Sequence, residues 1–383
     1  MAASALNFII VGASVSGLAS AIALKKAGHN ALVLEKEPQL GGIGSVQNGS
    51  GCAQICPNGC KILLDWGLEA EINAKSAPCS GFSVYKYAKG EAPSPDQLGI
   101  NRYDPAVLDE ARGRYVQFAH RDLVRVLYDV ALTPSDKIGS NSAAQVSIMF
   151  GSEVVNVDCD ACAVTLRSGK IHTAHGIIGA DGTNGVVRRA LMQEEGTKED
   201  DGPGVAAYCA TIPKALVLEN NLDVFYHHLG MTIWIGSNQG IRTFVVASLT
   251  FGNEQDITLF LYLRNGSHTS TWTQEAEMKI TDLLGPCDEH IRKLAELAGP
   301  ATCVQHELSK LESWVSRSGR VLALGEAAHP FPYGATQAYA VTLEDAAFIG
   351  KIFSHTRDRV RVPRVLPGLP RAQRTSRLPH PGR

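Results

Sequence analysis

The sequence lacks the features typical of membrane-spanning, secreted and nucleic-acid-binding proteins. It contains no run of about 18 consecutive apolar residues, so we expect no membrane-spanning helix. No basic segment precedes its first apolar run, so we expect no signal peptide. Its net charge of -2 leaves no overall positive field that would attract a nucleic acid.

Cysteine is present, but not in a pattern typical of disulfide frameworks or metal sites. The 9 cysteines are an odd number scattered through 383 residues, which favours reduced thiols in a cytoplasmic protein. Cys52, Cys56 and Cys60 match no common zinc or iron–sulfur spacing, so buried structural residues are the favoured interpretation and we expect no metal. Cys159 and Cys162 form a C-x-x-C in a predicted hairpin turn, where a redox role is disfavoured.

The amino-terminal segment has the pattern of a dinucleotide site. An apolar strand over residues 8–11 leads into the turn Gly12-Ala13-Ser14-Val15-Ser16-Gly17, a helix to about Ala27, and a second strand that ends at Glu35. A helix amino end attracts a pyrophosphate, and an acid about 20 residues beyond the glycines accepts hydrogen bonds from a ribose diol. Gly12, Ser14, Gly17 and Glu35 are therefore candidate cofactor contacts. An ordinary βαβ unit without a ligand is the alternative.

Ser14 is the departure within this turn, because it stands where the middle glycine is usual. A left-handed backbone there would cost a serine about 1–2 kcal/mol. We therefore expect φ of Ser14 to be negative.

The remaining elements predict two kinds of sheet. Alternating residues over 152–178, with a hairpin near Asp160, lead into Gly179-Ala180-Asp181-Gly182, and a buried strand over 321–324 leads into Gly325-Glu326-Ala327-Ala328-His329-Pro330. Between them, a mainly antiparallel sheet is predicted over 205–212, 222–227, 231–235, 242–249 and 258–263. Helices are predicted over about 56–66, from His120, over about 273–297, and from after Pro330 to about Ser354. Residues 81–110 are predicted to be irregular.

These three motifs in this order resemble the single-component FAD-dependent monooxygenases of the salicylate hydroxylase and para-hydroxybenzoate hydroxylase type, most closely the fungal members, over roughly residues 5–355. The resemblance implies an α/β fold, with a Rossmann-like FAD-binding domain and a mainly antiparallel β-sheet substrate domain. The expected division is 1–190 and 301–355 for the FAD-binding domain, 191–300 for the substrate domain, and 356–383 for an irregular Arg/Pro-rich tail. That tail is either a disordered basic arm or a misread gene end.

The resemblance also implies roles for individual residues. Arg121 corresponds to an arginine near the FAD phosphates, with a plain surface charge as the alternative, and Asp181 and Gly182 lie close to the cofactor. Glu326 corresponds to an acid, usually Asp, that contacts the ribityl chain. Gln337 and Ala338 belong to the turn beside the isoalloxazine, where Thr336-Gln337-Ala338 replaces the family's usual G-Q-G. The proline that the family has just before this turn stands one position earlier in this sequence, as Pro332.

Two residues are candidate catalytic groups. Tyr208 would hydrogen-bond a substrate, with core packing as the alternative, and Cys209 follows it where many fungal relatives place a catalytic arginine. His228 lies two residues after Tyr226 on a predicted strand and would deprotonate a phenol, since its pKa is near operating pH. A hydrogen-bonded structural histidine is the alternative.

The activity implied by the resemblance is hydroxylation of a small aromatic substrate, phenolic or an aromatic acid, by NAD(P)H and O2 through a flavin C4a-hydroperoxide. FAD would stay bound and NAD(P)H would bind transiently, because no second glycine-rich βαβ turn exists for it. Epoxidation of an alkene, another flavoenzyme such as a halogenase or reductase, and an inactive flavin-binding relative are the alternatives. The absence of a W-x-W pair among the 4 tryptophans disfavours the halogenase. The sequence does not define an oligomeric state.

Overall fold

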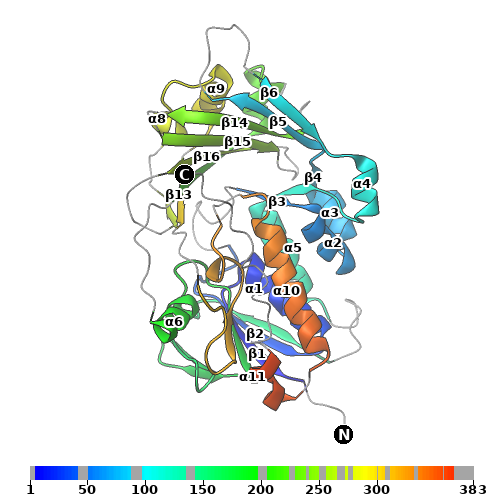
Figure 1. Ribbon diagram of the computed structural model, residues 1–383, viewed down its shortest axis with the longest axis vertical. Coiled ribbons are helices and arrows are strands. Elements are labelled where there is room, and N and C mark those ends of the chain that lie inside the picture. The colour runs from blue at the N-terminus through cyan, green and yellow to red at the C-terminus, as the bar shows by residue number, and fades with distance from the viewer. Residues whose placement is uncertain are drawn as a thin grey trace, which may run out of the picture.

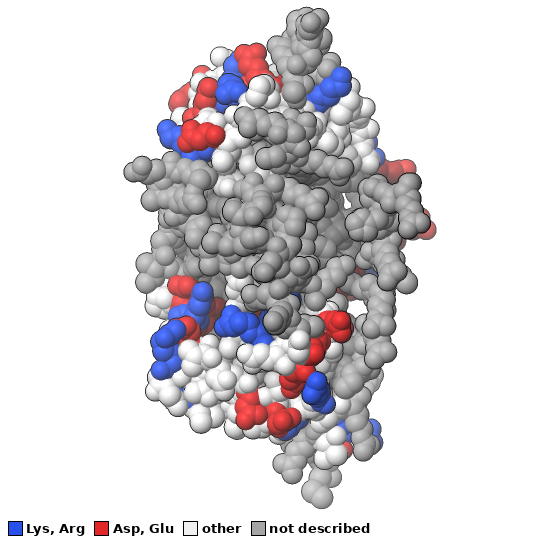
Figure 2. Space-filling model, turned by 60° about the vertical axis from the view of Figure 1, so that its left-hand side comes forward, with Lys and Arg blue, Asp and Glu red and all other residues white. Residues whose placement is uncertain are grey.

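A computed structural model shows two large sheets, with helices between them (Figure 1). It describes residues 5–41, 51–87, 97–134, 143–196, 205–223, 229–238, 241–249, 256–264, 272–274, 279–299, 301–306, 311–331, 335–356 and 358–365. In these residues no helix combines the length and apolar character needed to span a membrane. On the face shown in Figure 2, the described acidic and basic side chains are interspersed rather than gathered by sign.

The first sheet is parallel and five-stranded. Its order is β19 (Val321–Ala323), β12 (Gly176–Gly179), β1 (Asn7–Val11), β2 (Asn30–Leu34) and β8 (Val146–Met149). The central strand β1 is nearly continuously apolar because both faces are covered. Ile10 packs with the helices α1 (Val15–Lys26), α5 (His120–Leu132) and α10 (Ala338–Ser354). Ile9 packs toward α6 (Val186–Glu195) and the antiparallel strands β9 (Val154–Asp158), β10 (Ala163–Leu166) and β11 (Ile171–Thr173).

A buried histidine connects β1 with the end of α10. His29 Nδ1 accepts a hydrogen bond from the Leu6 N–H at 3.1 Å, and its Nε2 lies 2.8 Å from the Phe353 carbonyl oxygen. Since Nδ1 must accept, Nε2 carries the proton and donates it. The neutral ring therefore provides hydrogen-bond partners for two buried backbone groups, the Leu6 N–H before β1 and the Phe353 carbonyl of α10.

The second sheet is eight-stranded and mainly antiparallel. Its order is β17 (Trp272–Gln274), β18 (Thr302–His306), β13 (Val205–Ile212), β16 (Ile257–Arg264), β15 (Ile241–Leu249), β14 (Gly230–Asn238), β5 (Gly81–Lys86) and β6 (Gln97–Arg102). Within this sheet, β5 and β14 are the one described pair of neighbours that run parallel. One face is covered by α8 (Ile280–Leu283) and α9 (Glu289–Leu297), and α7 (Lys214–Glu219) packs against α9. The opposite face meets the layer that contains α10.

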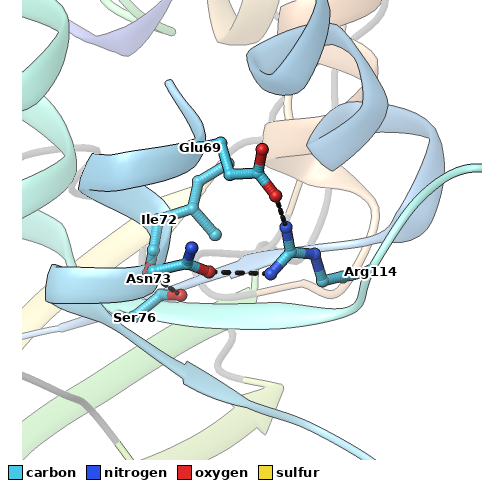
Figure 3. A network of polar contacts seen from close by, with 5 residues as sticks. All are labelled: Glu69, Ile72, Asn73, Ser76 and Arg114. Carbon is cyan, nitrogen blue, oxygen red and sulfur yellow. Dashed lines mark hydrogen bonds and ion pairs between the residues drawn. The ribbon is translucent and has the colours of Figure 1, made fainter. Parts of the chain in front are cut away.

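A small sheet with three helices beside it connects these layers. The strands of this sheet are, in order, β3 (Cys52–Ile55), β7 (Val116–Ala119) and β4 (Ser76–Pro78). Along the chain, α2 (Pro57–Asp65) and α3 (Glu69–Lys75) come between β3 and β4, and α4 (Pro105–Glu110) precedes β7. Arg114 fixes α3 beside β7: its guanidinium donates to Glu69 Oε1 and to Asn73 Oδ1, each at 2.7 Å (Figure 3). Ser76 closes the end of α3 by donating to the Ile72 carbonyl at 2.7 Å.

Several sequence-based expectations are wrong. The described parts of 81–110, residues 81–87 and 97–110, are not wholly irregular, since they contain β5, β6 and α4. Strand β5 pairs with β14, far along the chain. The helix expected over 273–297 is reduced to α8 and α9, and 272–274 is a strand. Strands β5, β6 and β18 belong to the eight-stranded sheet, although the expected boundaries assigned them to the FAD-binding domain.

The beginning of the expected tail is also ordered. Residues Arg359–Arg361 form the 3-10 helix η4 and Val362–Val365 form α11, in which Val362 is fully buried. Pro363 is compatible with helix here because the first turn needs no backbone N–H from it. Residues 366–383 and most of the expected strand over 222–227 lie outside the described part.

Candidate functional site

The amino end of α1 opens at the carboxyl ends of β1 and β12, the edge where open parallel sheets bind ligands. Gly12 has φ of +101°, and a Cβ there would lie 2.5 Å from the Ala180 carbonyl oxygen. A Cβ on Gly17 would lie 1.9 Å from the Gly12 carbonyl oxygen. Both positions therefore require glycine, and the backbone stays open for close approach of a ligand.

Ser14 adopts the backbone that its side chain needs. Its φ is -77°, so the expected negative φ is confirmed. Its hydroxyl donates to the Ala180 carbonyl oxygen at 3.0 Å and makes no capping bond to its own helix. The first turn of α1 also contains no acidic residue. Its N–H groups, which have no partner within the helix, thus suit a pyrophosphate.

Glu35 lies against the same turn. Its Oε2 accepts from the Ala13 N–H at 2.6 Å, and its Oε1 accepts from the Glu37 N–H at 3.0 Å. Each oxygen can still accept a second hydrogen bond, as it would have to if it bound a ribose hydroxyl. The structure therefore brings the glycine turn and the predicted acid together, in an arrangement that fits an adenosine diphosphate moiety.

Asp181 and Gly182 follow β12 at the adjacent strand end. Asp181 Oδ2 accepts from the Val187 N–H at 3.1 Å, near the start of α6, and burial raises the pKa of Asp181 to about 6. Gly182 has φ of +79° with open space around its Cα. Asp181 is thus a structural cap of α6 as well as a candidate cofactor contact.

Arg188 joins this segment to the third motif and was not identified from the sequence. It is buried on α6 and donates to the Ala327 carbonyl oxygen at 2.9 Å. Its signal in the sequence is a basic residue between Val187 and Leu191, on the apolar face of a helix.

The third motif forms the 3-10 helix η3 (Gly325–Ala327), which contains the half-buried Glu326. Asp345 of α10 holds this turn: its Oδ2 accepts from the Gly325 N–H at 3.2 Å and from His329 Nε2 at 2.5 Å. His329 also packs against Trp314, with ring centroids 5.1 Å apart. The sequence offered only a weak indication of Asp345, one acid on a mainly apolar helix.

Gln337 and Ala338 lie at the start of α10, where the Ala338 N–H donates to the Ala335 carbonyl oxygen at 3.0 Å. Gln337 is the N-cap and makes no side-chain capping bond, and the first turn has no acidic residue. The preceding Thr336 carbonyl accepts a hydrogen bond from Cys56 Sγ at 3.0 Å. In Figure 1 this end of α10 points toward the eight-stranded sheet. A helix amino end at this place would stabilise negative charge on a bound ring.

Arg121 lies in the first turn of α5, next to His120. Its side chain is 59% exposed and lies 3.8 Å from Asp122. His120 Nδ1 contacts Tyr339 Oη of α10 at 2.9 Å, and burial lowers the pKa of His120 to about 4. Neutral His120 therefore links α5 with α10, and Arg121 stays a candidate phosphate contact.

The two candidate catalytic residues are placed differently. Tyr208 is buried with Trp234, Leu259 and α9, on the sheet face opposite to Cys209, as its core-packing alternative expected. It therefore does not face the cofactor layer. His228 and Tyr226 lie outside the described residues.

Comparison with known proteins is consistent with this geometry. Residues 5–357 match the family described as FAD binding domain. The chain is 26% identical over 365 residues to the FAD-dependent monooxygenase atnJ of Arthrinium sp, covering 94% of this chain and 79% of that protein. It is also 26% identical over 375 residues to hispidin-3-hydroxylase of Neonothopanus nambi, covering 91% and 80%.

A solved structure shares the fold. The 2,6-dihydroxypyridine-3-hydroxylase of Arthrobacter nicotinovorans superposes with a TM-score of 0.70 at 18% identity, covering 95% of this chain and 88% of that one. The family match spans most of the sequence, so the chain belongs to the FAD-binding-domain family and is an FAD-dependent monooxygenase, an oxidoreductase.

Proposed function

We propose that this monooxygenase uses NAD(P)H and O2 to hydroxylate an aromatic substrate, either a phenol or an aromatic acid. The observation that carries the proposal is the sheet face that packs against the amino end of α10. Phe260 and Met231 of that face pack in one cluster with Tyr115 and with Ala340, in the first turn of α10. An aromatic, apolar surface beside the flavin end of the cofactor suits a planar ring.

The residues assigned to FAD divide along its length. Glu35 would hold the adenosine ribose, the amino end of α1 the pyrophosphate, and Glu326 the ribityl chain. Arg121 would add a phosphate contact, and Asp181 and Gly182 would lie beside the middle of the cofactor. The turn at Gln337 and Ala338 would lie beside the flavin ring.

Bound FAD supplies electron transfer from NAD(P)H and activation of O2. The protein must hold the aromatic ring in place and exclude water, and the buried cluster around Phe260 serves both purposes. His228 is the proposed base for a phenolic hydroxyl. We also propose that NAD(P)H binds transiently, because the described chain contains one glycine-rich βαβ turn.

Purified, FAD-loaded protein tests the proposal. We expect phenols to stimulate NAD(P)H oxidation, with one labelled oxygen atom from O2 incorporated per molecule oxidised. Alkene epoxides as products would support the alternative reaction. Flavin binding with no oxygenated product from any aromatic compound would contradict the proposal and favour an inactive relative.

A further inference from the structure

The turn that presents Glu326 is held by charged side chains on both sides of that residue. The N–H of Gly325, the residue before it, donates to Asp345 Oδ2 of α10 at 3.2 Å. The carbonyl oxygen of Ala327, the residue after it, accepts from the Arg188 guanidinium of α6 at 2.9 Å. Two helices that are far apart in the sequence therefore fix the backbone from which the Glu326 side chain extends.

The Asp345 carboxylate also binds the far end of the turn. Its Oδ2 accepts from His329 Nε2 at 2.5 Å, and the two side chains are only 12% and 11% exposed. The rings of Trp314 and Phe331 pack against His329, with centroids 5.1 and 5.4 Å from its own. One carboxylate oxygen thus ties both Gly325 and His329 to the middle of α10.

Arg188 gives the second constraint its strength. The residue is only 3% exposed, and a buried guanidinium is costly unless its N–H groups are hydrogen-bonded. A hydrogen bond from a charged donor is about twice as strong as one between neutral groups. The turn therefore has an anion at its N–H side and a cation at its carbonyl side, each matched to the polarity of the backbone group that it binds.

The same turn lies against the amino end of α1, where the pyrophosphate is expected. Gly325 has φ of +58°, and a Cβ there would lie 2.8 Å from Ser16 Oγ in the first turn of α1. The preceding Leu324 N–H donates to the Gly179 carbonyl oxygen at the end of β12 at 2.9 Å. A shift of this backbone would therefore move the Glu326 carboxylate relative to the glycine turn.

We propose that Asp345 and Arg188 are positioning residues that act on FAD through Glu326, by fixing the backbone from which its carboxylate reaches the ribityl chain. This inference rests on the proposed contact of Glu326 with the ribityl chain and deepens it. Glu326 has one methylene more than the aspartate usual at this place in the family, so its carboxylate has one more torsion to be ordered on binding. A backbone that is already fixed limits that ordering cost.

Titration of apoprotein with FAD, followed by flavin fluorescence, tests the proposal. Asp345→Ala and Arg188→Met should each raise the Kd for FAD about tenfold, whereas Asp345→Asn, which keeps an acceptor oxygen, should raise it less than about threefold. Glu344→Ala is the matched control, because it removes an exposed carboxylate from the next position of α10 that binds Asn58 of α2 and not the turn. Its Kd should stay within about twofold of wild type.

A double-variant cycle separates positioning from packing. In a Glu326→Ala background, Asp345→Ala should raise the Kd by less than about twofold, because the contact that it supports is already lost. A further increase of about tenfold there, or a wild-type Kd for Asp345→Ala alone, would overturn the positioning role. A lower apoprotein stability in urea with an additive cycle would likewise show a structural role only.

The outcomes also separate this inference from the contact on which it rests. A raised Kd for Glu326→Ala together with an additive cycle would refute the positioning role and leave the ribityl contact in place. An unchanged Kd for Glu326→Ala would refute the contact itself and the positioning role with it. If Asp345→Ala does not give folded apoprotein, the same cycle with Arg188→Met decides.

Discussion

Replacement of Glu35 gives the sharpest test of the cofactor assignment. Its two carboxylate oxygens accept from the Ala13 and Glu37 N–H groups at 2.6 and 3.0 Å, so the side chain is already positioned before any ribose binds. A hydrogen bond to a charged acceptor contributes about 1.5–3 kcal/mol. Loss of one ribose bond in Glu35→Ala should therefore raise the Kd for FAD about 10- to 150-fold, and loss of two by more, since about 1.4 kcal/mol is tenfold.

Glu35→Gln should have a smaller effect, because the amide keeps one acceptor but turns an N–H toward a donor. Glu37→Gln is the matched control: it removes the same charge two residues away and keeps the backbone N–H that Glu35 binds. The measurement is titration of apoprotein with FAD by flavin fluorescence, with thermal unfolding of each apoprotein to verify folding. A Kd for Glu35→Ala within about twofold of the Glu37→Gln value would refute the ribose assignment.

Three further predictions concern the turn, a buried histidine and a buried acid. Gly17→Ala should abolish flavin retention, because its Cβ would lie 1.9 Å from a carbonyl oxygen, whereas Ser14→Gly should retain flavin; retention by both, seen in the absorption spectrum, would contradict the close approach. His29→Phe should lower the free energy of unfolding by about 2–5 kcal/mol in urea, since two buried backbone groups lose their partner, and a loss under about 1 kcal/mol would be inconsistent with that role. Asp181→Asn should leave apoprotein stability nearly unchanged near pH 4. Because burial raises the folded pKa of Asp181 from 3.8 to about 6, ionisation penalises the folded wild type as pH rises through this window. The variant should thus gain up to about 3 kcal/mol over wild type above pH 6, and a pH-independent difference in urea unfolding would argue against it.

The part of the site that the sequence predicted well is the part made of neighbours in the chain. Strand, turn, helix and acid follow one another from residue 7 to Glu35, so one local pattern specifies them all. Strands β5 and β6 escaped the same reasoning because β5 pairs with β14, which begins at Gly230, and β6 pairs with β5. Their extended conformation is a tertiary effect, and nothing within residues 81–102 alone demands it.

The alternation of side chains between the two faces of a strand explains a second difference between prediction and structure, the placement of Tyr208. A one-residue step along β13 moves a side chain from one sheet face to the other. The segment around Tyr208 was recognised, but the face to which each residue points depends on the packing of α9 against the sheet. The structure puts Cys209, not Tyr208, toward the cofactor layer. Ala207 and Cys209 are therefore the residues of this strand that pack toward the layer containing α10.

The altered turn before α10 illustrates how a departure from a family pattern is accommodated. Thr336 stands where a glycine is usual, but among the described residues it is not one with positive φ, so glycine's freedom is not needed there. Its carbonyl is held by the Cys56 thiol, and α2 packs so closely on α10 that a Cβ on Gly59 would lie 2.8 Å from the Ala340 Cα. The Cys56 thiol at the N-cap of α2 and the close approach of Gly59 thus hold a turn that glycine would leave free, and they fix the position of the amino end of α10.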